Sequence, residues 1–158
     1  LLYGGTGTES VKKSQPEGLP EKFESGTQNM NGISGLKAGV DFVKNRGIKN
    51  IYNHEYKLAK RLFNGLANNR KVITYNKSFD YGKVAPVVSF NIDGVYSEDL
   101  VAKLNKYGIM TRGGLHCSPL AHTTMNTIEN GTVRVVPGAF NTINDINYLL
   151  NVIRKLTI

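Results

Sequence analysis

Apolar side chains recur at helical spacing in four segments of the chain. The pattern predicts helices over residues 33–43, 50–67 and 98–107 and a last helix from Thr142. Glycines at 47 and 108 are placed to end two of these helices, and Ser97 is placed to cap the third. Thr142 followed by Asp145 has the spacing of a capping box. The inward positions expected of the last helix are Ile146, Leu149, Leu150, Ile153 and Leu156.

Short β-branched segments bounded by turn residues alternate with these helices. They predict strands at 71–75, 84–92, 109–112 and 132–136. The gaps between several of them are short, as in antiparallel sheets. We therefore expect an α+β fold, with a mostly antiparallel four-stranded sheet and helices packed on one side.

Residues 1–31 differ from the rest of the chain, because they are rich in Gly, Ser, Thr, Gln and Asn and show no sustained periodicity. Such composition predicts an extended arm that lies on another surface. The expected organisation is an arm at 1–31 and a small domain at 32–158.

Length and composition indicate one globular domain, since 158 residues with 40% apolar content can build a single core. No segment reaches the roughly 20 consecutive apolar residues that span a bilayer. The single cysteine, Cys117, excludes an internal disulfide and suits a reducing compartment. We expect a cytoplasmic protein without membrane attachment. The net charge of +8 is scattered in short clusters, which favours solvated surfaces over nucleic-acid binding.

The segment 112–122 concentrates the chemistry, because it holds Cys117 and two of the three histidines on a loop that begins with two glycines. Nearby cations favour a reactive thiolate, and Arg112, His116 and His122 are candidates. By composition alone, a lone cysteine is more often a small buried side chain. A structural zinc site would need paired ligands that this segment lacks, so no metal is expected. A cysteine protease would need a distant, oriented histidine, which the sequence does not offer.

Several motifs together resemble one known family. The loop runs Arg-Gly-Gly-Leu-His-Cys-Ser-Pro from residue 112; upstream lie Gly-Gly-Thr-Gly at 4–7 and Phe-Glu-Ser-Gly-Thr-Gln-Asn at 23–29. Downstream, 132–134 and 140–146 complete the pattern. In order and spacing the chain resembles the carboxy-terminal part of class V aminotransferases, specifically cysteine desulfurases and selenocysteine lyases, which are fold-type I pyridoxal phosphate enzymes.

The resemblance implies a role for individual residues. Cys117 corresponds to the catalytic thiolate that takes sulfur from L-cysteine as a persulfide, leaving alanine. Arg134 corresponds to the arginine that binds the substrate carboxylate, although a strand arginine can equally face solvent. Gly26 and Thr27 correspond to the arm that reaches the cofactor phosphate of the other subunit in a homodimer, whereas alone they would indicate a simple turn. Arg112 and His116 correspond to supporting residues, for electrostatics and proton transfer.

The resemblance also has departures. Leu115 stands where well-known short-loop desulfurases carry a second histidine. The family's His-Lys pair, whose lysine holds the cofactor, has no counterpart among the 158 residues, and the first residue is Leu1. We therefore expect a carboxy-terminal fragment that is inactive by itself, and enzyme activity only in the full-length protein.

Three alternatives stay open at this point. The same fold carries selenocysteine lyases and class V aminotransferases. The chain would also serve as a non-catalytic interaction domain that binds its own dimer mate or a sulfur-acceptor protein. No nucleic acid is expected as a partner.

Overall fold

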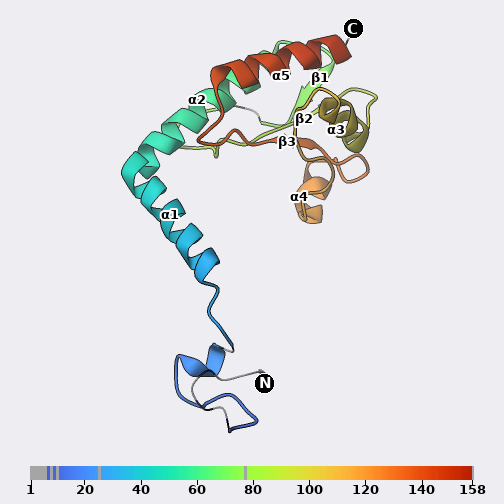
Figure 1. Ribbon diagram of the computed structural model, residues 1–158. Helices are drawn as coiled ribbons and strands as arrows, with labels where there is room; N and C mark the ends of the chain where they lie inside the picture. Colours follow the sequence, from blue (N-terminus) through green and yellow to red (C-terminus); the bar gives the residue numbers. More distant parts are fainter. Residues whose placement is uncertain (1–6, 8, 10, 25, 77, 158) are drawn as a thin grey trace. The chain divides into compact units, whose positions relative to one another are not determined.

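The computed structural model describes residues 7, 9, 11–24, 26–76 and 78–157. The chain divides into two compact units, residues 1–46 and 47–158. Each unit is described by itself (Figure 1).

The first unit holds a 3₁₀ turn, Glu21–Phe23, and the helix α1, Met30–Arg46. The predicted helix is thus confirmed and is longer at both ends. Asn29 starts it, because its side-chain oxygen accepts a hydrogen bond from the amide of Gly32 at 2.9 Å. Neither element contains a buried residue, and the apolar positions of α1 remain exposed: Ile33, Leu36, Val40 and Val43.

The second unit is built on a sheet of three strands, β1 (Val72–Thr74), β2 (Val88–Ile92) and β3 (Val133–Val135). They pair antiparallel in the order β1-β2-β3. The prediction of an antiparallel α+β fold is confirmed, but the expectation of four strands was wrong.

The predicted strand at 109–112 contributes only one isolated bridge, between Arg112 and Arg134. At its start, the amide of Ile109 donates to the carbonyl of Leu104 and so closes the preceding helix instead of pairing with a strand. At its end, a Cβ on Gly113 would lie 2.9 Å from the carbonyl oxygen of Ser97, so the backbone turns tightly against that residue. One residue of pairing is all that remains between these two constraints.

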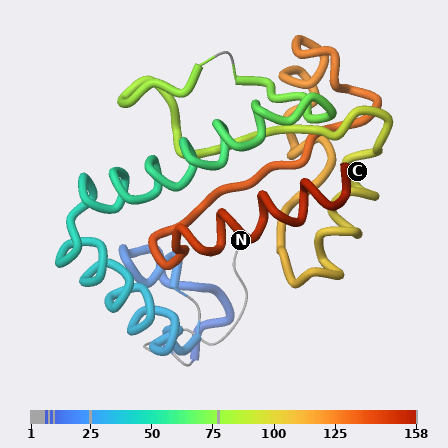
Figure 2. The backbone as a smooth tube through the Cα atoms, turned by 90° about the horizontal axis from the view of Figure 1, so that it is seen from above, coloured from blue at the N-terminus to red at the C-terminus, as the bar shows by residue number. Residues whose placement is uncertain are grey.

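Helices cover the apolar face of the sheet. These are α2 (Ile48–Ala67), α3 (Ser97–Asn105) and α5 (Ile143–Leu156). Figures 1 and 2 show α2 and α5 side by side. They run parallel, since Arg61 bonds Asn147 near their middle and Asn69 bonds Thr157 at their ends. The largest fully buried side chains of this core include Phe90, Leu62, Leu66, Leu100, Leu104, Ile153, Val88 and Val133.

The helix ends follow the sequence signals in part. The capping box of α5 is confirmed, because Thr142 accepts from the amide of Asp145 and the Asp145 carboxylate accepts from the amide of Thr142. Gly108 has a φ of 70° after α3, and Gly47 a φ of 81° before α2. Ser97, however, does not cap α3 and is buried as its first residue. Its hydroxyl, which was expected to cap the helix, instead donates to the carbonyl of Asn130 at 2.5 Å.

The other face of the sheet is polar. Side chains alternate along strands, so the positions next to buried Phe90 and Val133 point the opposite way. A short helix that the sequence did not predict, α4 (Pro119–Thr124), lies on this side of the sheet, away from α5 (Figure 1). The expectation that helices lie on one side therefore holds for α2, α3 and α5 but was wrong for α4. In the part of the chain that the structure describes, no helix combines the length and apolar character needed to cross a bilayer.

Candidate active-site loop on the polar face of the sheet

Residues 113–131, here called the cysteine loop, leave and rejoin the sheet at two glycines in direct contact. A Cβ on Gly131 would lie 2.6 Å from the Cα of Gly114, and Gly131 has a φ of 60°. The amide of Thr132 donates to the carbonyl of Gly114 at 3.1 Å. Asn91 of β2, which is buried, donates to the carbonyl of Gly131 at 2.8 Å. The base of the loop is therefore fixed on the sheet by backbone packing and by a buried amide.

Cys117 lies in a tight turn of this loop and is exposed. His116 and Cys117 both have left-handed backbone conformations, with φ of 53° and 59°. Such a conformation costs a non-glycine residue roughly 1–2 kcal/mol, so the surrounding structure must hold it. The amide of Ser118 donates to the carbonyl of Leu115 at 2.9 Å and closes the turn. The loop thus presents its thiol to solvent on a constrained backbone.

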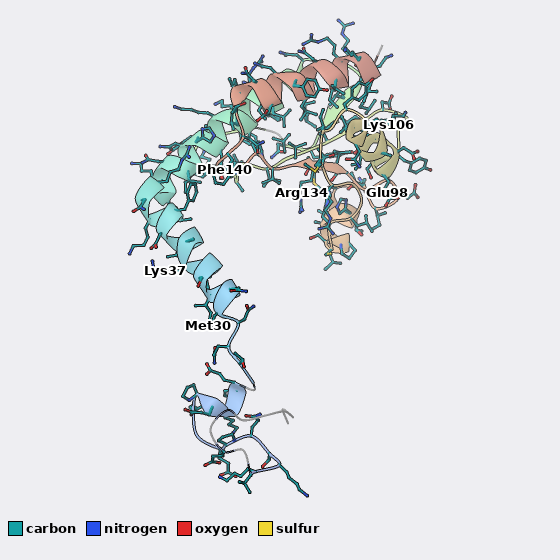
Figure 3. The ribbon with its side chains drawn as sticks, viewed as in Figure 1. Met30, Lys37, Glu98, Lys106, Arg134 and Phe140 are labelled. Atoms are coloured by element: carbon teal, nitrogen blue, oxygen red, sulfur yellow. The ribbon has the colours of Figure 1, made fainter. Side chains whose placement is uncertain are left out.

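Two arginines lie on the same face of the sheet as this thiol. Arg112 donates from Nη2 to the Sγ of Cys117 at 3.8 Å. Arg112 and Arg134 are bridge partners, with the amide of Arg134 donating to the carbonyl of Arg112 at 2.8 Å. Directly opposed residues of an antiparallel pair project their side chains to one side of the sheet. Figure 3 labels Arg134 on β3, where it is half-buried.

His116 is tied to the sheet. Its Nε2 donates to the backbone carbonyl of Thr132 at 2.9 Å, and its Nδ1 is buried without a partner among the described residues. The ring centroids of His116 and His122 are 5.7 Å apart. Burial lowers the pKa of His116, with smaller contributions from Arg134, His122 and Arg112, against the Thr132 hydrogen bond. The neutral imidazole with its proton on Nε2 fits this environment.

A pocket of about 340 Å³ lies between the polar face and α4. Two of its lining residues, His116 and His122, were candidates in the sequence. The others were not assigned a role there: Tyr75, Asn76, Ser89, Ser118, Ala121, Met125, Thr127 and Thr132. Burial raises the pKa of Tyr75, against a hydrogen bond from Asn91. The period-two pattern of β2 and β3 was the one available signal for Ser89 and Thr132, since each alternates with a buried apolar residue.

The remaining predicted site residues belong to the first unit. Gly26 has a φ of 78°, and no heavy atom lies within 4 Å of a Cβ built on it. Thr27 beside it is exposed. An open glycine next to a hydroxyl and a backbone amide has the donor chemistry that a phosphate group needs. Ser25 of the same motif lies outside the described residues.

Comparison with known proteins identifies the family. The family model described as aminotransferase class-V matches residues 1–149. A probable cysteine desulfurase of Pyrococcus abyssi is 35% identical over 161 residues, which cover 98% of this chain and 38% of that protein.

Solved structures agree with this relationship. The apo cysteine desulfurase of Thermococcus onnurineus NA1 is similar with a TM-score of 0.79 at 34% identity, over 99% of this chain and 38% of that one. The Escherichia coli cysteine desulfurase CsdA, solved as an S-sulfonic acid, has a TM-score of 0.74 at 26% identity, over 86% of this chain and 32% of that one. The chain therefore spans about two fifths of its first relatives. It belongs to the class-V aminotransferase family.

Proposed function

We propose that this chain supplies the sulfur-accepting and substrate-binding part of a pyridoxal phosphate-dependent cysteine desulfurase. The observation that carries the proposal is the placement of an exposed thiol, Cys117, on a constrained loop with Arg112 Nη2 3.8 Å from its sulfur. Arg134 projects from the same face of the sheet, as its bridge to Arg112 requires. The relatives named cysteine desulfurases support the reaction class.

Cys117 is the nucleophile in this proposal. Its thiolate attacks the sulfur of L-cysteine, a sulfur–sulfur bond forms, and the carbon–sulfur bond of the substrate breaks with its electron pair left on the β carbon. That carbon takes up one proton, equivalent to the proton that the thiol has lost, so the products are alanine and a persulfide on Cys117 and all atoms of the substrate and the thiol are conserved. A soft, polarizable thiolate is suited to attack on sulfur, and Arg112 Nη2 donates to the sulfur of Cys117 at 3.8 Å.

Arg134 binds the substrate carboxylate. A guanidinium presents two parallel donors, which match the two oxygens of a carboxylate. Its half-buried position on β3, facing the same side as Arg112, supports this assignment over that of a solvated strand arginine. His116 acts as a neutral anchor of the loop in this arrangement, because its Nε2 proton is committed to the carbonyl of Thr132.

Pyridoxal phosphate, when bound, supplies the electron sink for breaking the carbon–sulfur bond. Gly26 and Thr27 would hold its phosphate, across the interface of a homodimer, from the arm at 1–31; residues 32–158 would form the small domain. The 158 residues contain no His-Lys pair. We accordingly expect the isolated chain to be inactive and the activity to belong to the full-length protein. The persulfide would pass to an acceptor protein in a reducing compartment such as the cytoplasm.

The test uses the full-length protein with L-cysteine and a thiol reductant, and measures alanine and sulfide. We expect Cys117→Ser to abolish sulfide release and Arg134→Gln to raise KM for L-cysteine at least tenfold. Leu120→Ala serves as the matched control, since Leu120 is exposed three residues from the cysteine and is expected to retain activity. Mass spectrometry should find a 32 Da adduct, roughly one sulfur atom, on Cys117 alone.

Unchanged turnover of Cys117→Ser would contradict the proposal. Turnover of L-selenocysteine but not L-cysteine would assign the lyase instead, and amino transfer without sulfide would assign an aminotransferase. A full-length protein that never acquires the cofactor's absorbance would leave only a non-catalytic interaction role.

A further inference from the structure

A second pocket, of about 550 Å³, lies in the second unit at the carboxyl ends of α2 and α5. It is here called the basic pocket, and three arginines line it: Arg61, Arg70 and Arg154. They come from three segments that are separate in sequence, namely the middle of α2, the turn after it and the last turn of α5. The fold therefore brings together three arginines that are far apart in sequence.

The arginines have no acidic counterpart in the described chain. All three are exposed, and none forms an ion pair with a described carboxylate. Of the three guanidinium groups, only that of Arg61 forms a hydrogen bond among the described residues, to the side-chain oxygen of Asn147 at 3.1 Å, which holds it against α5. Uncompensated like charges around one concavity repel one another, and an anion that enters it would relieve this repulsion.

A simpler explanation for these arginines is that their charges balance the helix dipoles. The parallel packing of α2 and α5 places both carboxyl ends at the pocket, as the bond between Asn69 and Thr157 shows. Each end carries roughly half a negative charge, so together they offset about one of the three guanidinium charges. A clear positive excess remains after that correction.

The rest of the lining narrows the class of ligand. Besides the arginines it includes the polar side chains of Asn68, Asn69 and Thr157, whereas Leu150 and Ile153 beneath them are buried. A Cβ on Gly65 would lie 2.5 Å from a methyl group of Leu150, so the absence of a side chain at this position lets the two helices approach. No aromatic side chain lines the pocket, which removes the stacking platform that single-stranded nucleic acid uses.

We infer that the basic pocket is a docking site for an acidic segment of a partner protein. Several carboxylates of the partner pair with Arg61, Arg70 and Arg154. Guanidinium forks match carboxylates in paired geometry, and several such pairs at one site act as a network. The site is separate from the cysteine loop, since no residue lines both pockets.

The test measures fluorescence anisotropy of a labelled peptide, Glu-Glu-Leu-Glu-Glu, with the full-length protein at 150 mM NaCl. We expect saturable binding that weakens with added salt, and at least tenfold weaker binding to the double variant Arg70→Gln and Arg154→Gln. The guanidinium groups of these two arginines form no hydrogen bond to other side chains among the described residues, and the Thr157 hydroxyl bonds Arg154 only at its backbone carbonyl, so the variant should fold, which circular dichroism checks. The matched control is Lys49→Gln with Lys83→Gln, which removes two charges outside the pocket and should change binding less than twofold.

Four outcomes would overturn the inference. They are equal weakening by the control variant, tighter binding of a single-stranded oligonucleotide of equal charge, complete competition by 10 mM inorganic phosphate at constant ionic strength, and equal binding of a Gln-Gln-Leu-Gln-Gln peptide. Full recovery of binding in the variant Arg70→Lys with Arg154→Lys would support charge as the main determinant, and partial recovery would support the paired geometry of guanidinium; both agree with the proposal.

Discussion

Single residues of the cysteine loop were predictable as a set but not in their geometry. Cys117, Arg112 and His116 lie within six residues of sequence, so their presence at the start of one loop needed no structure. Their orientation did, because His116 and Cys117 both adopt positive φ and form a turn, whereas an extended chain would point them to opposite sides. Thr132, whose backbone carbonyl accepts the hydrogen bond from Nε2 of His116, is sixteen residues away and carries no sequence signal of that role.

His116 should make the stability of the protein depend on pH. Its pKa is lowered in the folded chain, mainly by burial, from an ordinary value of 6.5. The unfolded chain therefore binds more protons as the pH falls through 6.5, so stability is fullest above that pH and is lost below it, until the folded pKa is passed. We expect the melting temperature to fall between pH 7.5 and pH 5.5 more steeply in the unsubstituted protein than in His116→Gln.

The glutamine keeps an N–H donor for the carbonyl of Thr132 and does not titrate, which makes it a suitable comparison. Melting curves recorded by circular dichroism at four pH values would give the two slopes. Parallel slopes for both proteins would show that protonation of His116 does not oppose folding.

At the level of elements, the cysteine loop depends on the contact between its two ends. Gly131 combines a positive φ with a backbone approach to Gly114 that leaves no room for a methyl group. Sequence shows the glycines but gives no sign that they touch, because they are seventeen residues apart. The same limit applies to Ser97. Its hydroxyl donates to the carbonyl of Asn130 in this loop and does not cap the helix that Ser97 begins.

Gly131→Ala should destabilise the protein by about 2–5 kcal/mol, since it adds steric overlap to the cost of a positive φ. Gly82→Ala is the matched control, because Gly82 has a φ of 77° with nothing within 4 Å of its Cβ position. That control should lose only about 1–2 kcal/mol, the conformational cost alone. Urea denaturation of both variants measures the difference.

Equal losses in the two alanine variants would mean that the ends of the loop separate without cost. The contact between Gly114 and Gly131 would then not be what fixes the loop on the sheet.

At the scale of the whole molecule, the second unit carries the core. Among the described residues, every buried apolar side chain lies between Tyr56 and Ile153. The apolar positions of α1 stay exposed, and its helix ends where Gly47 takes a φ of 81°. The buried core therefore lies entirely on the carboxy-terminal side of the boundary between the units at residues 46 and 47.

Removal of residues 1–46 should leave the second unit folded. We expect the free energy of unfolding of residues 47–158 to differ from that of the 158-residue chain by less than about 1 kcal/mol, a small part of a typical domain's stability. Urea denaturation followed by circular dichroism compares the two. A truncated chain without a cooperative transition would show that the first unit contributes to the core's stability.

The sequence by itself determined the family, the helices α1, α2, α3 and α5, and the reactive loop. Helical periodicity, the capping box at Thr142 and the motif around Cys117 are local patterns, each complete within about ten residues. Only the tertiary structure decided how many strands pair, where α4 lies, and which distant groups meet. Loss of the fourth strand, the closing of the cysteine loop by Gly131 and the gathering of Arg61, Arg70 and Arg154 all depend on contacts between segments far apart in the chain. Such contacts follow from packing in three dimensions, for which one sequence carries no periodic signal.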